Sequence, residues 1–230
     1  MKNNIVSIDL DEIQNSFLYE ESLSKLRTNI QFLDKNLRVL LFTSSIPGEG
    51  KTEVSFQLSV SLSKIGKKVL YIDGDMRNSK FAAQCSVKGK VNGISQFLSG
   101  EASEQEIIHT TNIENLDVVF SGAPVKKPSE LLYDYALDKF IAEQKKIYDF
   151  VIIDSPSLSN ISDAAIIGRC VDGAVIVVKS STVSQRMVKK VKDQLEKVNC
   201  RILGAVLNGL EMKKSSYHYK YYGDYYSYKK

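Results

Sequence analysis

Cysteine and long apolar runs are both scarce in this 230-residue chain. Its three cysteines, Cys85, Cys170 and Cys200, lie far apart, with no CxxC pair and no clustered histidines, which excludes a zinc site and a disulfide framework and predicts buried, reduced thiols. No stretch approaches the ~18 apolar residues of a membrane span. The first nine residues lack the apolar core of a signal peptide. We therefore expect a cytoplasmic protein.

Excess charge of one sign is also missing. The chain has 31 basic and 27 acidic residues, a formal net charge of +4 that is too small and too evenly spread to indicate nucleic acid as the main partner. With 43% hydrophobic residues, a chain of this length can bury one sizeable core. We expect a single domain with short appendages.

Short apolar runs bounded by turn residues recur along the chain and predict strands buried on both faces. These runs cover residues 38–43, 68–73, 116–120, 149–154, 173–178 and 201–207. Helical spacing predicts helices between them, over residues 52–65, 129–146, 162–169 and 184–198, and an exposed N-terminal helix over residues 19–33. Alternating strands and helices predict an α/β fold, a doubly wound, mostly parallel sheet flanked by helices. Ligands of such sheets bind beyond the carboxyl ends of the strands.

A phosphate-binding loop follows the first predicted strand. The sequence Ser45-Ile-Pro-Gly-Glu-Gly-Lys-Thr52 is a P-loop with serine in place of the first glycine. Its glycines let backbone N–H groups surround an anion, Lys51 would reach the β- and γ-phosphates, and the Thr52 hydroxyl would ligate Mg²⁺. The predicted nucleotide-binding residues here are Pro47, Gly48, Glu49, Gly50, Lys51, Thr52 and Glu53. A plain glycine-rich turn is the alternative, but the flanking strand and helix favour the P-loop.

Carboxylates follow two further strands at the same predicted edge of the sheet. Asp73 and Asp75 end one strand together with Arg77, and Asp154 ends another. Hard carboxylate oxygens suit Mg²⁺, which takes only one or two protein ligands. One carboxylate is thus left to orient or deprotonate an attacking hydroxyl, and the residues do not decide between Asp73 and Asp75. Capping of the following turns is the alternative role.

Three motifs, SSIPGEGKT, VLYIDGDMR and FVIIDSP, closely resemble the Walker A, A′ and B motifs of the bacterial tyrosine kinases of capsule and exopolysaccharide synthesis, the BY-kinase family. The likeness extends over nearly the whole chain, including residues 93–100, 129–132 and 203–208. It implies a P-loop fold of the MinD/ParA type and a non-specific protein-tyrosine kinase that uses ATP and Mg²⁺.

The resemblance also implies roles for single residues. Lys51, Asp73, Asp75 and Asp154 form the implied catalytic set. Thr52, Asp75 and Asp154 hold Mg²⁺, largely through water for the two aspartates, and Asp73 becomes the candidate base. Asn208 is implied to meet the adenine, with capping of a loop as its alternative role.

The chain departs from the family pattern at several points. Ser157 stands where a second proline is usual, and Asn78-Ser79 replace the usual Lys-Pro after the Walker A′ arginine. Ser24 replaces the middle arginine of the ExxRxxR oligomerisation motif, whose other two positions are Glu21 and Arg27, and Lys25 remains as a second cation beside them. We expect this helix to pack in a homo-oligomeric ring, an octamer by resemblance. A simply solvated charged helix is the alternative.

The C-terminal segment holds seven of the twelve tyrosines. They are Tyr217, Tyr219, Tyr221, Tyr222, Tyr225, Tyr226 and Tyr228. No aliphatic residue interrupts them, so the segment cannot form a core and is expected to be a mobile autophosphorylation substrate. A strip that stacks on single-stranded nucleic acid and an unstructured terminus without function are the alternatives. The expected organisation is an N-terminal segment and helix (1–34), a kinase domain (35–212) and the tyrosine-rich tail (213–230).

Two functions are consistent with the nucleotide site. One is an autophosphorylating tyrosine kinase that regulates capsular polysaccharide synthesis and export, and the other is a MinD/ParA-type ATPase switch. The second type usually has a signature lysine where Ile46 stands, which favours the kinase. The chain has no NKxD sequence for a guanine pocket. The resemblance implies a membrane-embedded activator, recruitment to the inner face of the membrane, and a cognate tyrosine phosphatase.

Overall fold

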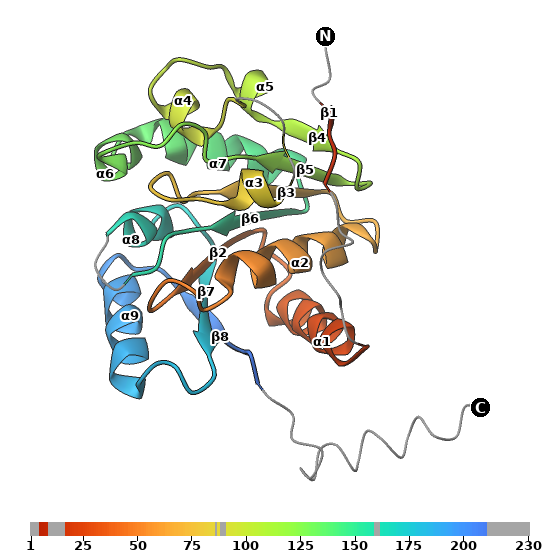
Figure 1. Ribbon diagram of the computed structural model, residues 1–230, viewed down its shortest axis with the longest axis vertical. Coiled ribbons are helices and arrows are strands. Elements are labelled where there is room, and N and C mark those ends of the chain that lie inside the picture. Colours follow the sequence, from red (N-terminus) through yellow and green to blue (C-terminus); the bar gives the residue numbers. More distant parts are fainter. Residues whose placement is uncertain (1–4, 9–16, 86, 88–90, 159–161, 211–230) are drawn as a thin grey trace, which may run out of the picture.

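The computed structural model describes residues 5–8, 17–85, 87, 91–158 and 162–210. Within them, eight strands form one sheet in the spatial order β1-β4-β5-β3-β6-β2-β7-β8 (Figure 1). The strands are β1 (Ile5–Val6), β2 (Val39–Ser44), β3 (Val69–Asp73), β4 (His109–Thr111), β5 (Leu116–Val119), β6 (Phe150–Asp154), β7 (Gly173–Lys179) and β8 (Ile202–Asn208). Every neighbouring pair is parallel except β4 with β5. The predicted doubly wound, mostly parallel sheet is confirmed.

Helices cover both faces of the sheet. Residues of α1 (Phe17–Leu33), α2 (Lys51–Ser63) and α3 (Phe81–Gln84) pack into one core, and residues of the remaining helices pack into the other. The remaining helices are α4 (Ile94–Leu98), α5 (Glu104–Ile107), α6 (Pro128–Leu132), α7 (Tyr135–Ile147), α8 (Asp163–Gly168) and α9 (Gln185–Lys197). Successive residues of β2 alternate between the two cores, with Leu40 in one and Leu41 in the other. This explains the nearly continuous apolar runs, because a strand covered on both faces needs them.

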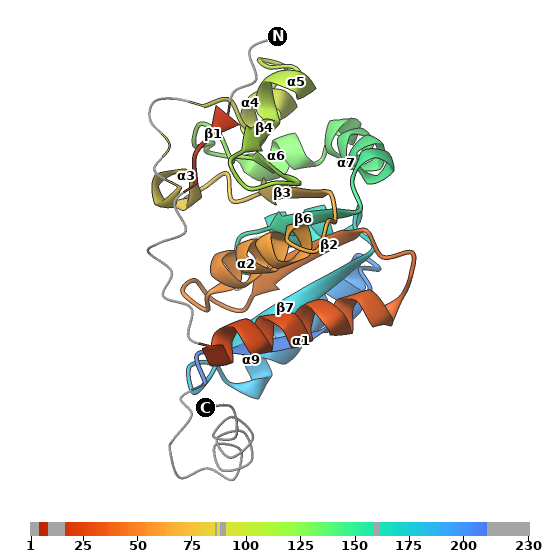
Figure 2. The same cartoon turned by 90° about the vertical axis from the view of Figure 1, so that its right-hand side faces the viewer.

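The N-terminal helix differs from its prediction as an exposed element. It lies beside α2 in both views (Figures 1 and 2). Ile30 is buried, and Leu23 and Leu26 are partly buried in the same core. A helix that presents apolar residues at this spacing covers a neighbour rather than standing in solvent.

Two predictions of local structure were incomplete. The sequence patterns did not predict β1 and β4, which have two and three residues and are too short for a period to be recognised. The single helix expected over residues 129–146 is two helices, α6 and α7. They are separated because Asp134 adopts an extended conformation as the N-cap of α7.

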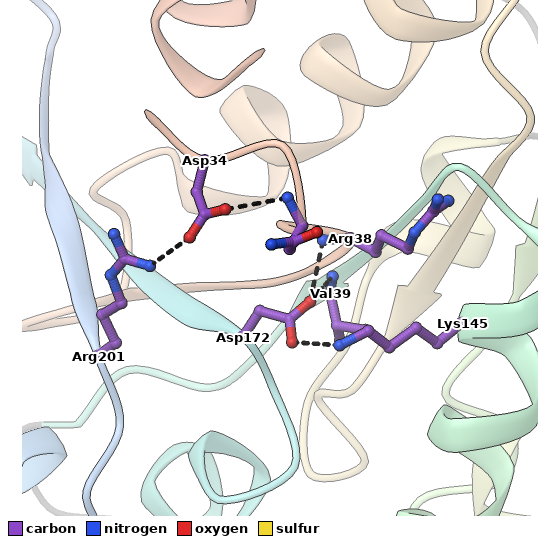
Figure 3. Close-up of polar contacts among 7 residues, drawn as sticks. Asp34, Arg38, Val39, Lys145, Asp172 and Arg201 are labelled. Carbon is purple, nitrogen blue, oxygen red and sulfur yellow. Dashed lines mark hydrogen bonds and ion pairs between the residues drawn. The ribbon is translucent and has the colours of Figure 1, made fainter. Parts of the chain in front are cut away.

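The amino ends of the parallel strands are joined by polar side chains (Figure 3). Asp172, directly before β7, accepts hydrogen bonds from the backbone N–H groups of Arg38 and Val39 at 2.9 Å each and pairs with Lys145 of α7. Arg201, directly before β8, pairs with Asp34 at 2.9 Å. These contacts tie α1, α7 and three strands together at the edge opposite the predicted site.

Cys85 and Cys200 are buried free thiols and Cys170 is a half-buried one. In the residues that the structure describes, none of the helices is both apolar enough and long enough to cross a lipid bilayer.

Candidate nucleotide-binding and phosphotransfer site

The loop between β2 and α2 has the backbone of a phosphate-binding loop. Gly48 and Gly50 adopt φ values of +85° and +84°, a backbone conformation that residues with a side chain rarely adopt. A Cβ atom on Gly50 would lie 2.0 Å from Asn208 Nδ2, so this position also requires the absence of a side chain. Gly50 is the N-cap of α2, a helix of 13 residues whose first N–H groups form an anion-binding end.

The side chain of Glu49 holds the phosphate-binding loop in place. The side chain is buried, and its carboxylate accepts hydrogen bonds from Ile46 N at 2.8 Å and from Lys179 N at 3.1 Å. The loop is thereby closed on itself and tied to the end of β7. The Glu49 side chain therefore has its partners within the protein, and nucleotide binding by Glu49 stays a prediction.

Asn208, at the end of β8, lies against the same loop. Its Nδ2 donates to the carbonyl oxygen of Glu49 at 3.0 Å, and its Oδ1 accepts from Gly209 N at 2.9 Å. Both ends of the amide therefore have a partner within the chain. The adenine contact stays a prediction.

Asp154 and Thr52 form the polar centre of the site. Thr52 Oγ1 donates a hydrogen bond to Asp154 Oδ2 at 2.5 Å. Among the described residues, Asp154 Oδ1 and Ser45 Oγ are buried without a hydrogen-bond partner. A buried carboxylate oxygen without a partner is costly unless a ligand completes it.

The pKa of Asp154 is set by its burial and by four nearby groups. Burial raises its pKa to about 7, and the carboxylates Asp73 and Asp75 act in the same direction. The ammonium of Lys51 and the hydrogen bond from Thr52 oppose this shift. Asp73 and Asp154 are directly paired residues at the ends of the neighbouring strands β3 and β6.

A magnesium ion fits these residues. The Thr52 hydroxyl donates a hydrogen bond to Asp154, so the lone pairs of its oxygen are left for a cation, and Asp154 Oδ1 lacks a partner. In the described part of the chain, no three His, Cys, Asp or Glu side chains are placed to hold a metal. Mg²⁺ does not require such a group, because it keeps several waters and the substrate phosphates as ligands.

Asp73 is buried and held by three donors. Its Oδ2 accepts from Ser79 Oγ at 2.5 Å and from Ser121 N at 3.3 Å, and its Oδ1 accepts from Asp75 N at 3.3 Å. Burial raises the pKa of Asp73 to about 6, while the hydrogen bonds lower it. Nothing in the sequence motifs pointed to Ser121, which is brought to Asp73 by the pairing of β5 with β3.

Asp75 and Arg77 are more constrained than the sequence suggested. Asp75 Oδ1 accepts the backbone N–H groups of Arg77 and Asn78 at 3.2 and 3.1 Å, as in the turn-capping alternative. The Arg77 guanidinium forms two hydrogen bonds, of 2.7 and 3.1 Å, with the buried carboxylate of Asp163 at the start of α8. Asp163 is a further residue that the sequence reasoning missed.

The predicted oligomerisation residues lie on α1. Glu21 and Lys25 form an ion pair at 2.8 Å on the helix surface. Arg27 donates to the carbonyl and hydroxyl oxygens of Ser61 in α2 at 3.1 and 2.8 Å and to Ser24 Oγ at 3.1 Å. Arg27 therefore joins two helices of one chain. The seven tail tyrosines lie outside the described residues.

This phosphate loop, set between a buried strand and a helix, with an aspartate at the end of the adjacent strand, defines a P-loop nucleotide-binding protein. A family model described as an AAA domain matches residues 37–206. The tyrosine-protein kinase CpsD of Streptococcus agalactiae is 38% identical over 211 residues, 92% of this chain and 90% of the relative. The tyrosine-protein kinase YwqD of Bacillus subtilis is 32% identical over 97% of this chain and 92% of its own. The chain belongs to this family of bacterial tyrosine kinases, as its motifs predicted.

Solved structures agree with this assignment. The chimerical protein CapA2B2 superposes with a TM-score of 0.81 at 31% identity, over 90% of this chain and 95% of that one. The kinase domain of the Escherichia coli tyrosine kinase ETK gives 0.79 at 29% identity, over 86% and 79%. MinD from Pyrococcus horikoshii, complexed with Mg-ADP, gives 0.64 at 27% identity, over 74% and 70%. The kinases match more of this chain than MinD does.

Proposed function

We propose that this chain is an ATP- and magnesium-dependent protein tyrosine kinase that phosphorylates the tyrosines of its own C-terminal tail, between subunits. The juxtaposition of Thr52, Asp154 and Asp73 at one edge of the sheet carries this proposal. Two of these residues suit a metal–phosphate group, and the third suits a proton acceptor. The names of the relatives support a protein tyrosine kinase activity.

Different residues would hold the phosphates of the nucleotide and the metal ion. The backbone of the loop 45–50 and the Lys51 ammonium would hold the β- and γ-phosphates. Thr52 would ligate Mg²⁺ directly, and Asp154 and Asp75 would hold its waters. The bound metal would neutralise the charge that develops on the phosphate oxygens.

Asp73 is the residue best placed to receive the proton of the tyrosine. In the proposed reaction the tyrosine oxygen forms a bond to the γ-phosphorus. The bond to the β,γ-bridging oxygen breaks, and ADP leaves with its electron pair. A pKa near 6 leaves Asp73 ionised at neutral pH but still basic enough to accept the proton.

The tail would act as both substrate and switch. Residues 213–230 have five lysines and one aspartate, so their formal charge is +4 before modification. Each phosphate adds about −1.5 to −2 charge, and full modification would reverse the sign of the tail. Crowded negative charge near a subunit interface would favour dissociation of the ring, which we propose is formed through α1 with Glu21, Lys25 and Arg27.

The cellular role is proposed from the family resemblance of the motifs. A membrane-embedded activator would recruit the kinase to the inner face of the cell membrane. A tyrosine phosphatase would reset the tail. The cycle would regulate the synthesis and export of capsular or extracellular polysaccharide.

Replacing all seven tail tyrosines by phenylalanine is expected to remove most phosphotyrosine and leave nucleotide affinity unchanged, because the tail lies outside the phosphate loop. Intact-mass spectrometry after incubation with ATP and Mg²⁺ measures the phosphates, and nucleotide titration measures affinity. Native mass spectrometry of the same samples tests the switch. An unchanged oligomer after complete modification would refute the switch, and undiminished phosphorylation of the phenylalanine variant would refute the tail as substrate.

A further inference from the structure

Ser79 is the closest hydrogen-bond donor to the proposed base. It lies in the connection between β3 and α3, and its hydroxyl donates to Asp73 Oδ2 at 2.5 Å. The other two donors to this carboxylate are backbone N–H groups at 3.3 Å. A hydroxyl that donates to an ionised carboxylate makes a charge-assisted hydrogen bond, which is stronger than one between neutral groups. Proline, which the family resemblance gives as the usual residue at this position, has no hydroxyl and could not make this contact.

The hydroxyl of Ser79 is itself held in place. Its oxygen accepts a hydrogen bond from Phe81 N at 3.0 Å, which leaves its proton for Asp73. The Phe81 side chain is buried, with its ring centroid 4.8 Å from that of Tyr71 and 5.8 Å from that of Phe120. Phe81 therefore anchors Ser79 to the buried aromatic cluster next to the site.

The two oxygens of Asp73 are unequally occupied as a result. Oδ2 accepts from Ser79 and Ser121, whereas from the residues that the structure describes Oδ1 accepts only the long hydrogen bond from Asp75 N. The terminal torsion of an aspartate is broad when no partner restrains it. A strong donor on one oxygen removes this freedom and fixes which oxygen has a free lone pair.

We propose that Ser79 is a positioning residue for phosphotransfer: its hydroxyl holds the Asp73 carboxylate so that Oδ1 accepts the proton of the incoming tyrosine. This inference rests on the proposed role of Asp73 as the base. Ser79 acts through Asp73, with no contact to the nucleotide required. Its loss therefore lowers turnover and leaves ATP binding intact.

The test uses one chain as the kinase and a second, inactive chain as the acceptor of the phosphate. The enzyme is the full chain with all seven tail tyrosines replaced by phenylalanine, and the acceptor is the full-length Lys51→Met chain with its tail intact. Initial rates of phosphotyrosine formation at varied ATP give kcat and the KM for ATP. Ser79→Ala is expected to lower kcat about 10- to 100-fold, the range for a slightly misplaced catalytic group, with the KM for ATP unchanged.

Two further variants distinguish positioning from damage to the fold. Ser79→Thr keeps the hydroxyl and is expected to restore kcat to within a few-fold of the parent, while Asp73→Asn is expected to lose activity with or without Ser79. Ser99→Ala is the matched control, because Ser99 is exposed at the end of α4 and its hydroxyl donates to the carbonyl oxygen of Gln96, away from the site.

The possible results test the role of Ser79 and the proposed kinase function separately. An unchanged kcat in Ser79→Ala beside an inactive Asp73→Asn overturns the role of Ser79, as does a threonine variant that is as slow as the alanine one. A raised KM for ATP with kcat unchanged also overturns it, because the serine would then serve nucleotide binding. Full activity of Asp73→Asn, or an inactive parent enzyme, instead refutes the proposed function.

Discussion

Replacing Lys51 by methionine is expected to reduce tail phosphorylation by about 10²–10³-fold or more, the usual cost of removing one electrostatic contact to a transition state. Lys51 is the first residue of α2 and is close enough to Asp154 to lower its pKa. Methionine keeps most of the length of the side chain and removes its charge. The fold should survive, because Lys51 is only half-buried.

Lys64→Met is the matched control for this variant. Lys64 is exposed at the other end of the same helix and is expected to tolerate the change. Phosphotyrosine is measured by mass spectrometry, and folding by circular dichroism. Persistent tail phosphorylation in a folded Lys51→Met protein would count decisively against the proposed site.

Replacing Asp154 by asparagine is expected to have a comparably large effect on activity and a separate effect on stability. The burial that raises the pKa of Asp154 to about 7 means that the folded protein binds a proton there more tightly than the unfolded chain does. Without metal and nucleotide, stability should therefore fall as pH rises from about 4 to about 7. A shift of this size corresponds to as much as about 4 kcal/mol at neutral pH.

Asparagine cannot titrate, so the variant should lose much of this pH dependence. Urea unfolding of the metal-free proteins across this pH range measures the difference. Asp149→Asn, at the opposite end of β6, is the control and should keep the pH dependence of the parent. Equal pH dependence in Asp154→Asn and the parent would mean that Asp154 is not the buried acid that the structure indicates.

The parallel sheet could be predicted from the sequence because its strands are buried on both faces. Runs such as residues 150–154 are apolar at nearly every position, and only a sheet with helices on both sides needs this. Asp73 and Asp154 could be placed together because parallel strands present their carboxyl ends at one edge. In the structure the two aspartates lie directly opposite each other on β3 and β6.

Side-chain partners that are distant in sequence could not be predicted in this way. The buried Glu49 carboxylate braces the loop against Lys179, and Arg77 pairs with Asp163 of α8. The sequence motifs predicted that Glu49 binds the nucleotide and gave Arg77 no role. Their actual partners depend on the packing of β7 and α8, which no local pattern contains.

The arrangement of Thr52 and Asp154 can be tested most directly by a crystal structure with Mg²⁺ and a non-hydrolysable ATP analogue. We predict a metal ligated by the Thr52 hydroxyl oxygen, with Asp154 Oδ1 hydrogen-bonded to one of its waters and the terminal phosphates surrounded by the loop 45–50. A nucleotide bound elsewhere, or a metal that leaves Asp154 Oδ1 without a partner, would contradict the account.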